Sequence, residues 1–272
     1  LEYMTALLSV FKHDNDKVAI YIADCRRLGF DVLSPAINAS DLDFRIEDRL
    51  DQPAAIRFGL GAVKNVGESA VKTVLKARRE GDNFERLEDF ARRVDLRHVG
   101  KRALESLVKV GALDCLGSRI AILDSLERIL ALSSAHFRAI EVGQMSLFGA
   151  STGISDDLAV SPAIAEVPRR RQLGWEKELL GVYVSDHPLT PHVEGLARVV
   201  THFSAELRDA TQGQQVCVAG EICHIRPYQT KSGKAMGFVT LEDLQGMIEL
   251  VVFSRVWNDV SKWLQPEMIV LV

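Results

Sequence analysis

A turn at Gly67 carries the first residues that could bind a ligand. Val66 is expected to pack inside a hairpin of two short helices, and Gly67 to allow an unusual backbone angle. The amides around Gly67 would lie at the N-terminus of the second helix, where free donors and the helix dipole favour a phosphate oxygen. Lys64 and Lys72 would add charge attraction that reads no base sequence. The candidate contacts are Lys64, Asn65, Val66, Gly67, Glu68, Ser69 and Lys72.

A second copy of this turn lies at Gly100, where an apolar residue and a glycine again precede a helix. Between Arg57 and Arg102 the sequence holds twelve basic and seven acidic residues, a local basic excess in a chain of net charge −4. The alternative is an ordinary turn with solvated charges, but two copies within one basic stretch favour tandem helix-hairpin-helix motifs that bind duplex DNA. The candidate contacts of the second copy are His98, Val99, Gly100, Lys101 and Arg102.

An apolar pair lies in a stretch that is rich in small and polar residues. The composition of residues 143–168 predicts a linker, where Leu147 and Phe148 have no obvious core to join. Two exposed anchors of this kind suit the pocket of a partner protein, with Gln144 forming a hydrogen bond at its edge. Local packing is the alternative. The predicted partner-binding peptide is Gln144, Met145, Ser146, Leu147 and Phe148.

Aromatic and basic side chains surround a predicted β-hairpin in the C-terminal part of the sequence. Aromatic rings stack on bases while lysines follow the backbone, so this combination is typical of single-strand binding. The alternative is a glycine turn with solvated lysines. The candidate contacts are Arg226, Tyr228, Lys231, Lys234 and Phe238.

The spacing of apolar residues changes along the chain from a helical period to a strand period, and it predicts the elements that position these sites. Helices are expected at 1–27, 68–79, 84–93, 101–110, 119–132 and 169–182, with short extended pieces between 31 and 51. Strands are expected at 216–225, 236–241, 247–253 and 268–272, with a helix at 254–264. This order indicates a small Greek-key barrel of the OB type whose fifth strand would lie beyond Val272. The fold class is therefore α+β and multidomain: a mainly helical N-terminal part, then a truncated OB-type β-barrel.

Composition argues against several classes of protein. With 47% hydrophobic and 26% charged residues among 272, the chain is not expected to be disordered or a disulfide miniprotein. No apolar run reaches the ~20 residues of a membrane helix, and no signal peptide is recognisable. Four scattered cysteines predict neither zinc nor disulfides, and they indicate the cytoplasm. Asp41 and Asp43 lack a third acid, so no metal site is expected.

Together, these motifs resemble the bacterial DNA polymerase III alpha subunit, a C-family replicative polymerase. The resemblance covers essentially the whole chain, and its most specific parts are residues 2–8, 56–67, 144–148, 175–181 and 185–189. It implies the end of the fingers region at 1–51, tandem helix-hairpin-helix motifs at 52–117, a helical segment at 118–142, a linker with a clamp-binding peptide at 143–168, a helical connector at 169–210 and an incomplete OB-fold domain at 211–272. Because both ends of the chain read as interrupted elements, we expect a piece of a longer protein.

The resemblance also implies an activity, DNA-template-directed DNA synthesis by the parent subunit with Mg²⁺. The family's catalytic aspartates belong to a palm domain expected upstream of Leu1, so no catalytic residue and no cofactor is expected here. Expected partners are double- and single-stranded DNA, the sliding clamp and other holoenzyme subunits, with no membrane contact. The alternatives are a non-enzymatic clamp-tethered DNA-binding adaptor and a DNA repair enzyme or ligase, although the K-x-D-G string of a ligase is missing from the sequence.

Overall fold

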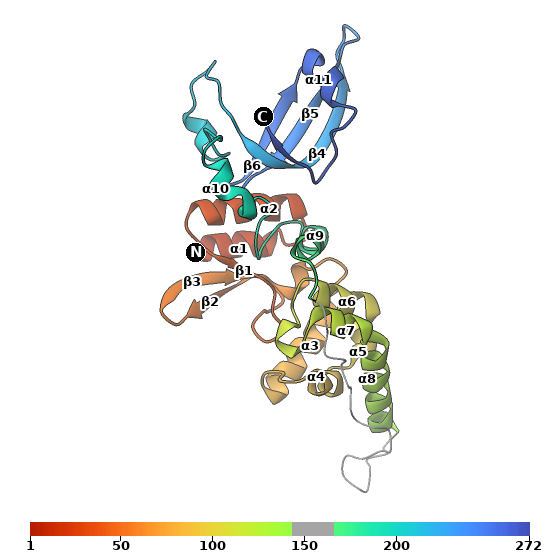
Figure 1. Ribbon diagram of the computed structural model, residues 1–272. Coiled ribbons are helices and arrows are strands. Elements are labelled where there is room, and N and C mark those ends of the chain that lie inside the picture. The colour runs from red at the N-terminus through yellow and green to blue at the C-terminus, as the bar shows by residue number, and fades with distance from the viewer. Residues whose placement is uncertain (143–165) are drawn as a thin grey trace. The chain divides into compact units, whose positions relative to one another are not determined.

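The computed structural model describes residues 1–142 and 166–272, and contacts divide the chain into two units (Figure 1). The helical unit comprises Leu1–Ala19 and the described part of Phe30–Ser185. The strand unit comprises Ile20–Gly29 and Asp186–Val272. Within the described ranges no helix is both long and apolar enough to cross a membrane.

The helical unit begins with a helix and a small sheet. α1 spans Glu2–Val10, and the sheet consists of β1 (Val32–Leu33), β2 (Arg45–Arg49) and β3 (Gln52–Arg57) in the order β1-β3-β2. β1 runs parallel to β3, whereas β2 pairs with β3 in the antiparallel sense. The sheet accounts for the short extended pieces that the sequence predicted.

The helix predicted over residues 1–27 is two helices. α2 spans Asn15–Arg27, and the chain between it and α1 forms a turn at residues 11–14. Asp14 is the last residue of this turn and directly precedes α2. Its Oδ1 accepts a hydrogen bond from the Lys17 amide in the first turn of α2 at 3.2 Å. An aspartate in this position caps a new helix. The helical pattern over residues 1–27 is therefore confirmed, but the turn within it was not predicted.

Two glycines explain part of the motif at residues 56–67. Gly59 and Gly61 flank the start of the short helix η1 (Leu60–Ala62), against which the loop at Leu42 lies closely. The amide of Gly61 donates to the Leu42 carbonyl at 2.9 Å. A Cβ at Gly59 would lie 2.6 Å from the carbonyl carbon of Asp43. The close approach of two backbones therefore requires a residue without a side chain at this position.

The rest of the helical unit is a group of helices around one core. They are α3 (Glu68–Gly81), α4 (Leu87–Arg93), α5 (Leu96–Val99), α6 (Lys101–Lys109), η2 (Asp114–Leu116), α7 (Arg119–Asp124), α8 (Leu126–Glu141) and α9 (Arg169–Leu180). The core includes Phe84, Phe90, Leu96, Leu104 and Leu107, all buried. The helix predicted at 119–132 is in fact α7 and α8, separated at Ser125.

The strand unit is a curled four-stranded sheet with a short helix. β4 (Ala219–Gln229), β5 (Ala235–Glu242), β6 (Met247–Val252) and β7 (Ile269–Leu271) lie in the order β6-β5-β4-β7, and all neighbours are antiparallel. α11 (Ser254–Val260) precedes β7. The segments that lead into the sheet are η3 (Thr190–His192), α10 (Val193–Leu196) and η4 (Glu206–Asp209). This order confirms the OB-type strand pattern predicted from the sequence.

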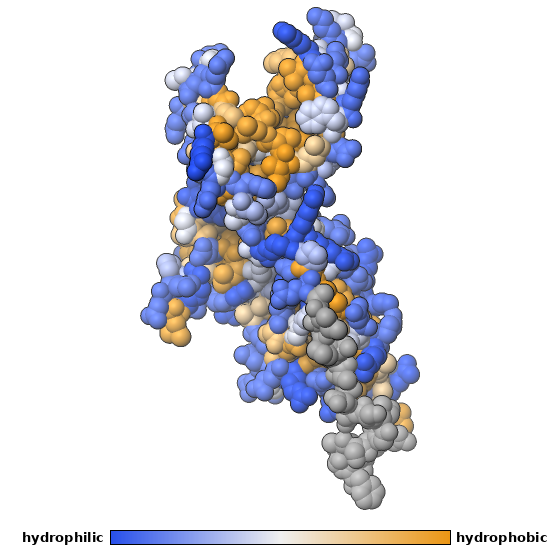
Figure 2. Space-filling model, viewed as in Figure 1, coloured by the Kyte–Doolittle hydropathy of each residue, from blue (hydrophilic) through white to orange (hydrophobic). Residues whose placement is uncertain are grey.

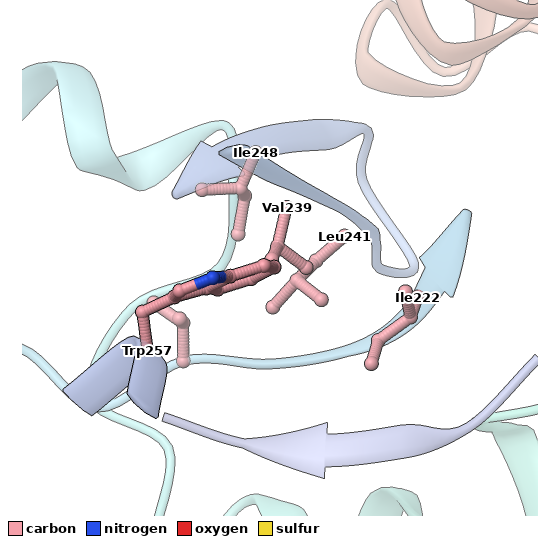
Figure 3. Close-up of a cluster of buried hydrophobic side chains, with 6 residues drawn as sticks. Ile222, Val239, Leu241, Ile248 and Trp257 are labelled. Atoms are coloured by element: carbon pink, nitrogen blue, oxygen red, sulfur yellow. The ribbon is translucent and has the colours of Figure 1, made fainter. Parts of the chain in front are cut away.

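The core of the strand unit lies between the sheet and α11. Trp257 extends from α11 towards Val239 and Leu241 (Figure 3). Gly237 permits this packing, because a Cβ there would lie 2.0 Å from the indole Cζ3. Apolar side chains continue along the hollow side of the unit (Figure 2), where partly buried residues pack against the cluster: Leu207, Val216, Ile225, Leu250, Val252, Leu264, Met268 and Val270. The side chains of Arg226, Tyr228 and Phe238 do not belong to this cluster.

Candidate nucleic-acid interface

The first hairpin consists of η1, a turn and α3. Val66 anchors the turn, since it is only 8% exposed, whereas Gly67, Glu68 and Ser69 lie at the surface. The Val71 amide donates to the Gly67 carbonyl at 3.1 Å. Of the backbone that the structure describes, nothing accepts a hydrogen bond from the three amides before Val71. They are the free donors of a helix N-terminus.

The residue with unusual backbone angles in this turn is Asn65, not Gly67. Gly67 has φ −78° and ψ 155°, which any residue adopts, so the prediction for its backbone was wrong. Asn65 has φ +69°, a left-handed conformation that asparagine tolerates better than most residues. Gly67 has another consequence: as N-cap of α3 it has no side-chain oxygen to bond the helix amides, as a serine or aspartate would. The amides therefore stay available.

The second hairpin consists of α5, Gly100 and α6. Gly100 has φ +80°, so here the predicted need for glycine is met. Its amide donates to the Leu96 carbonyl at 2.9 Å and is not available to a ligand. The Leu104 amide donates to the Gly100 carbonyl at 3.1 Å, and α6 has no side-chain cap. The free donors of this hairpin are the amides of residues 101–103.

The two hairpins are joined by direct contacts. α3 packs against α5, and the Asn65 side-chain amide donates to the Ser106 hydroxyl of α6 at 3.2 Å. The Lys64 backbone amide donates to the Leu179 carbonyl of α9 at 2.9 Å. Asn65, a predicted DNA contact, thus also connects the first hairpin to the second. The helical unit therefore presents both rows of free amides from one packed structure.

Much of the basic excess between Arg57 and Arg102 is used inside the protein. Arg78, for example, binds Asp41 at 2.8 Å and the carbonyls of Ile37 and Ser40 at 3.0 and 2.7 Å. Arg57, Arg93 and Arg97 likewise bind carboxylates at 2.5, 2.8 and 2.6–2.7 Å. Lys72, Lys76, Arg86 and Lys101 form ion pairs at the surface. Across the described ranges, the side chains of Lys64 and Arg102 have no ion pair and are exposed.

A charged cluster supports the second hairpin. Asp95 caps α5 by accepting from the Arg97 amide at 3.1 Å, and it also accepts from the Arg97 guanidinium at 2.7 and 2.9 Å. This hydrogen bonding holds the pKa of Asp95 below its ordinary value. Arg97 also binds Glu141 at the end of α8 at 2.6 Å. His98, a predicted DNA contact, lies beside Asp95 with 3.2 Å between Nδ1 and Oδ2.

The predicted single-strand residues lie together on the outer face of the strand unit. Arg226 and Phe238 are cross-strand partners, and the guanidinium lies 4.5 Å from the ring centroid. The rings of Tyr228 and Phe238 are 5.9 Å apart and inclined at 73°. Lys231 and Lys234 are exposed in the turn between β4 and β5. The structure thus groups all five candidates along β4, β5 and their connection.

Sequence analysis missed two neighbours of this face. Val251 pairs with Phe238 across β5 and β6 and is 45% exposed. Phe253 follows β6 and is 70% exposed. The signal was present, because Met247, Glu249 and Val251 alternate with the core residues of β6. We name Arg226, Tyr228, Phe238 and Val251 the outer-face cluster.

Comparison with known proteins agrees with this geometry. A family model described as a helix-hairpin-helix motif matches residues 29–122, and one described as an OB-fold nucleic acid binding domain matches residues 216–272. A DNA polymerase III subunit alpha of Thermus aquaticus is 39% identical over 277 residues, covering 100% of this chain. Those of Vibrio cholerae and Pseudomonas aeruginosa are 32% and 33% identical, covering 100% and 99%. The chain belongs to the DNA polymerase III alpha subunit family.

The chain spans 22–24% of the length of these alpha subunits. The peptide that the family resemblance assigns to the clamp, Gln144–Phe148, lies outside the described residues. In the part that is described, no group of three metal-ligating side chains is present. Asp41 binds Arg78, and Asp43 binds Lys12 at 2.5 Å. These carboxylates connect parts of the helical unit, and they do not fit the magnesium site of a polymerase.

Proposed function

We propose that the helical unit binds duplex DNA by its phosphates. The observation that carries this proposal is the pair of uncapped helix N-termini at α3 and α6, which are held in one packed unit. Each offers free amides and the positive end of a helix dipole, the combination that binds phosphate. Lys64 and Arg102 are exposed cations beside these ends. Loss of duplex affinity on their removal is the test of this proposal.

Phosphate binding of this kind does not depend on base sequence. Backbone amides contact phosphate oxygens, which are the same at every step of the duplex, whereas sequence is read at base edges. A polymerase that moves along its template needs such a contact. The match to a helix-hairpin-helix family model supports this role.

The strand unit would bind single-stranded DNA on its outer-face cluster. Tyr228 is 49% exposed and lies edge-to-face with Phe238, so one ring is presented to a base while the other supports it. Arg226 stacks on Phe238 and adds a positive charge. Lys231 and Lys234 extend the charge along the strand's backbone. The match to an OB-fold nucleic acid binding domain supports this role.

Replacing Tyr228 and Phe238 by alanine should weaken single-strand binding by about five- to 150-fold. Stacking contributes about 1–3 kcal/mol per base, and the pair presents one ring to one base. The measurement is fluorescence anisotropy with a labelled oligothymidine. Duplex affinity should stay within about twofold of the unmodified chain. Unchanged single-strand affinity in a folded variant would remove the strand unit from the proposal.

The peptide Gln144–Phe148 would attach the chain to the sliding clamp. Both proteins would then be held on the same duplex, so that rebinding becomes intramolecular and is governed by effective concentration. In the sequence the peptide lies between α8 and α9, two helices of the unit that is proposed to bind the duplex, and this supports the role. Other holoenzyme subunits are further partners that the family resemblance suggests.

The whole alpha subunit would perform DNA-template-directed DNA synthesis, and this chain would hold the DNA. Asp41 and Asp43 are paired with Arg78 and Lys12, which supports this division of roles. In the complete polymerase, bound Mg²⁺ would supply activation of the primer hydroxyl and charge stabilisation of the leaving pyrophosphate.

Primer extension by this chain with Mg²⁺ should therefore be absent. The assay is a labelled primer annealed to a longer template, with all four nucleotides and duplex binding confirmed in the same buffer. The reason is that no group of three metal-ligating side chains occurs among residues 1–142 and 166–272. Template-dependent extension would show that catalytic acids have been overlooked in this chain.

A further inference from the structure

Glu127 places a carboxylate at the second hairpin. Its side chain, which is 75% exposed, forms an ion pair and hydrogen bond with Lys101, which is 56% exposed. Lys101 is the first residue of α6 and follows Gly100 directly. The ammonium group therefore belongs to the same helix end as the free amides of the second hairpin.

The position of Glu127 is set by the fold. The surface pairs of α3, Glu68–Lys72 and Lys76–Glu80, are each formed within one helical turn. Glu127 comes instead from the first turn of α8, a separate helix. α8 is fixed to the second hairpin further along, where the buried Ser133 hydroxyl accepts from the Leu96 amide at 3.0 Å and donates to the Val94 carbonyl at 2.9 Å.

We propose that Glu127 competes with DNA phosphate for Lys101 and so sets the affinity of the second hairpin. The proposal rests on duplex binding by the hairpins as proposed above. A carboxylate and a phosphate are both anions that accept hydrogen bonds from an ammonium group. Phosphate binding at Lys101 has to displace Glu127 first, and when the phosphate leaves, Glu127 takes its place.

This exchange makes the contact with DNA easier to reverse. The Lys101 ammonium group is already paired with the Glu127 carboxylate. Its contact with phosphate therefore contributes less binding free energy, because one ion pair is broken as another forms. The hydrogen bond from Lys101 to Glu127 also raises the pKa of Lys101, so the competition is for a charged group. A chain that must advance along a duplex benefits from contacts that release readily.

The first experiment is Glu127→Gln in the full chain. Duplex affinity at ~0.1 M salt should rise about two- to fivefold, the range expected from an exposed ion pair. The plot of the logarithm of affinity against the logarithm of salt concentration should become steeper by up to ~0.9, the slope of one phosphate contact that no longer replaces an ion pair within the protein. The matched control is Glu178→Gln, an equal change of charge at an exposed residue of α9. It should leave both quantities unchanged.

The second experiment repeats the substitution in a Lys101→Ala background. Competition for Lys101 requires that the gain from Glu127→Gln disappear there. A gain of the same size would mean that Glu127 only repels DNA at a distance, which overturns the inference. No gain in either background would overturn it as well.

These outcomes are separate from a failure of the proposed function. If Lys64→Ala with Arg102→Ala leaves duplex affinity unchanged, the hairpins do not bind DNA, and both proposals fail. If that variant loses affinity while Glu127→Gln matches the unmodified chain, only the competition is contradicted. Circular dichroism of each variant confirms that the helices are retained.

Discussion

Replacing Lys64 and Arg102 together by alanine should weaken binding to duplex DNA by about 60-fold at ~0.1 M salt. Each phosphate contact changes the logarithm of affinity by ~0.9 per tenfold change in salt concentration. Relative to ~1 M salt, where such contacts contribute little, each therefore contributes about eightfold at ~0.1 M. The slope of the logarithm of affinity against the logarithm of salt concentration should accordingly become shallower by ~1.8. Fluorescence anisotropy with a labelled duplex, titrated at several salt concentrations, measures both quantities.

A matched control separates these two side chains from basic charge in general. Lys76 and Arg86 carry the same charges but lie away from the two helix N-termini, beside Glu80 and Glu88. Alanine at both should cost little, because each cation already has an anion beside it. Single-strand affinity should be retained in both double variants. An equal loss of duplex affinity in the control would contradict the assignment of the hairpins.

Replacing Leu147 and Phe148 by alanine should abolish measurable binding to the sliding clamp. Burying one large apolar side chain contributes about 1.5–3 kcal/mol, so removing two anchors corresponds to a loss of about 100-fold or more. Surface plasmon resonance with the clamp of the same organism on the sensor measures this loss.

Two further measurements make the clamp experiment specific. Ser146→Ala changes a neighbouring side chain of the same peptide and should keep most of the affinity, because hot-spot energy is concentrated in large anchors. Duplex affinity should be unaffected by the substitution of Leu147 and Phe148. A clamp affinity that survives the double substitution would assign clamp contact to another part of the chain.

The fold could be predicted from the sequence where local patterns determine it. The helix N-terminus at Lys101 was expected at the residue where it lies, because an apolar residue and Gly100 directly precede a helical pattern. The strands of the OB-type sheet were recognisable from alternation and glycine turns. α5, however, has only four residues, too few for a helical period to show.

The candidate site was less predictable, because its charges depend on distant contacts. Twelve basic residues suggested a broad patch, but Arg78 is bound to Asp41, 37 positions away. Lys101 and Glu127 are separated by 26 positions. Pairs of this kind follow from the tertiary structure and leave no pattern in the sequence. The hydrogen bond of Asn65 to Ser106, 41 residues further along, was not predicted for the same reason.

The central claim is that free backbone amides at two helix N-termini hold the duplex by its phosphates. Hydrogen exchange of single amides, followed by NMR in an isotope-labelled chain, tests it most directly. On saturation with duplex DNA, the amides of residues 68–70 and 101–103 should exchange more slowly. The Gly100 amide, which is already bonded to Leu96, should change little. Unchanged exchange at all six positions, with duplex bound, would contradict the account.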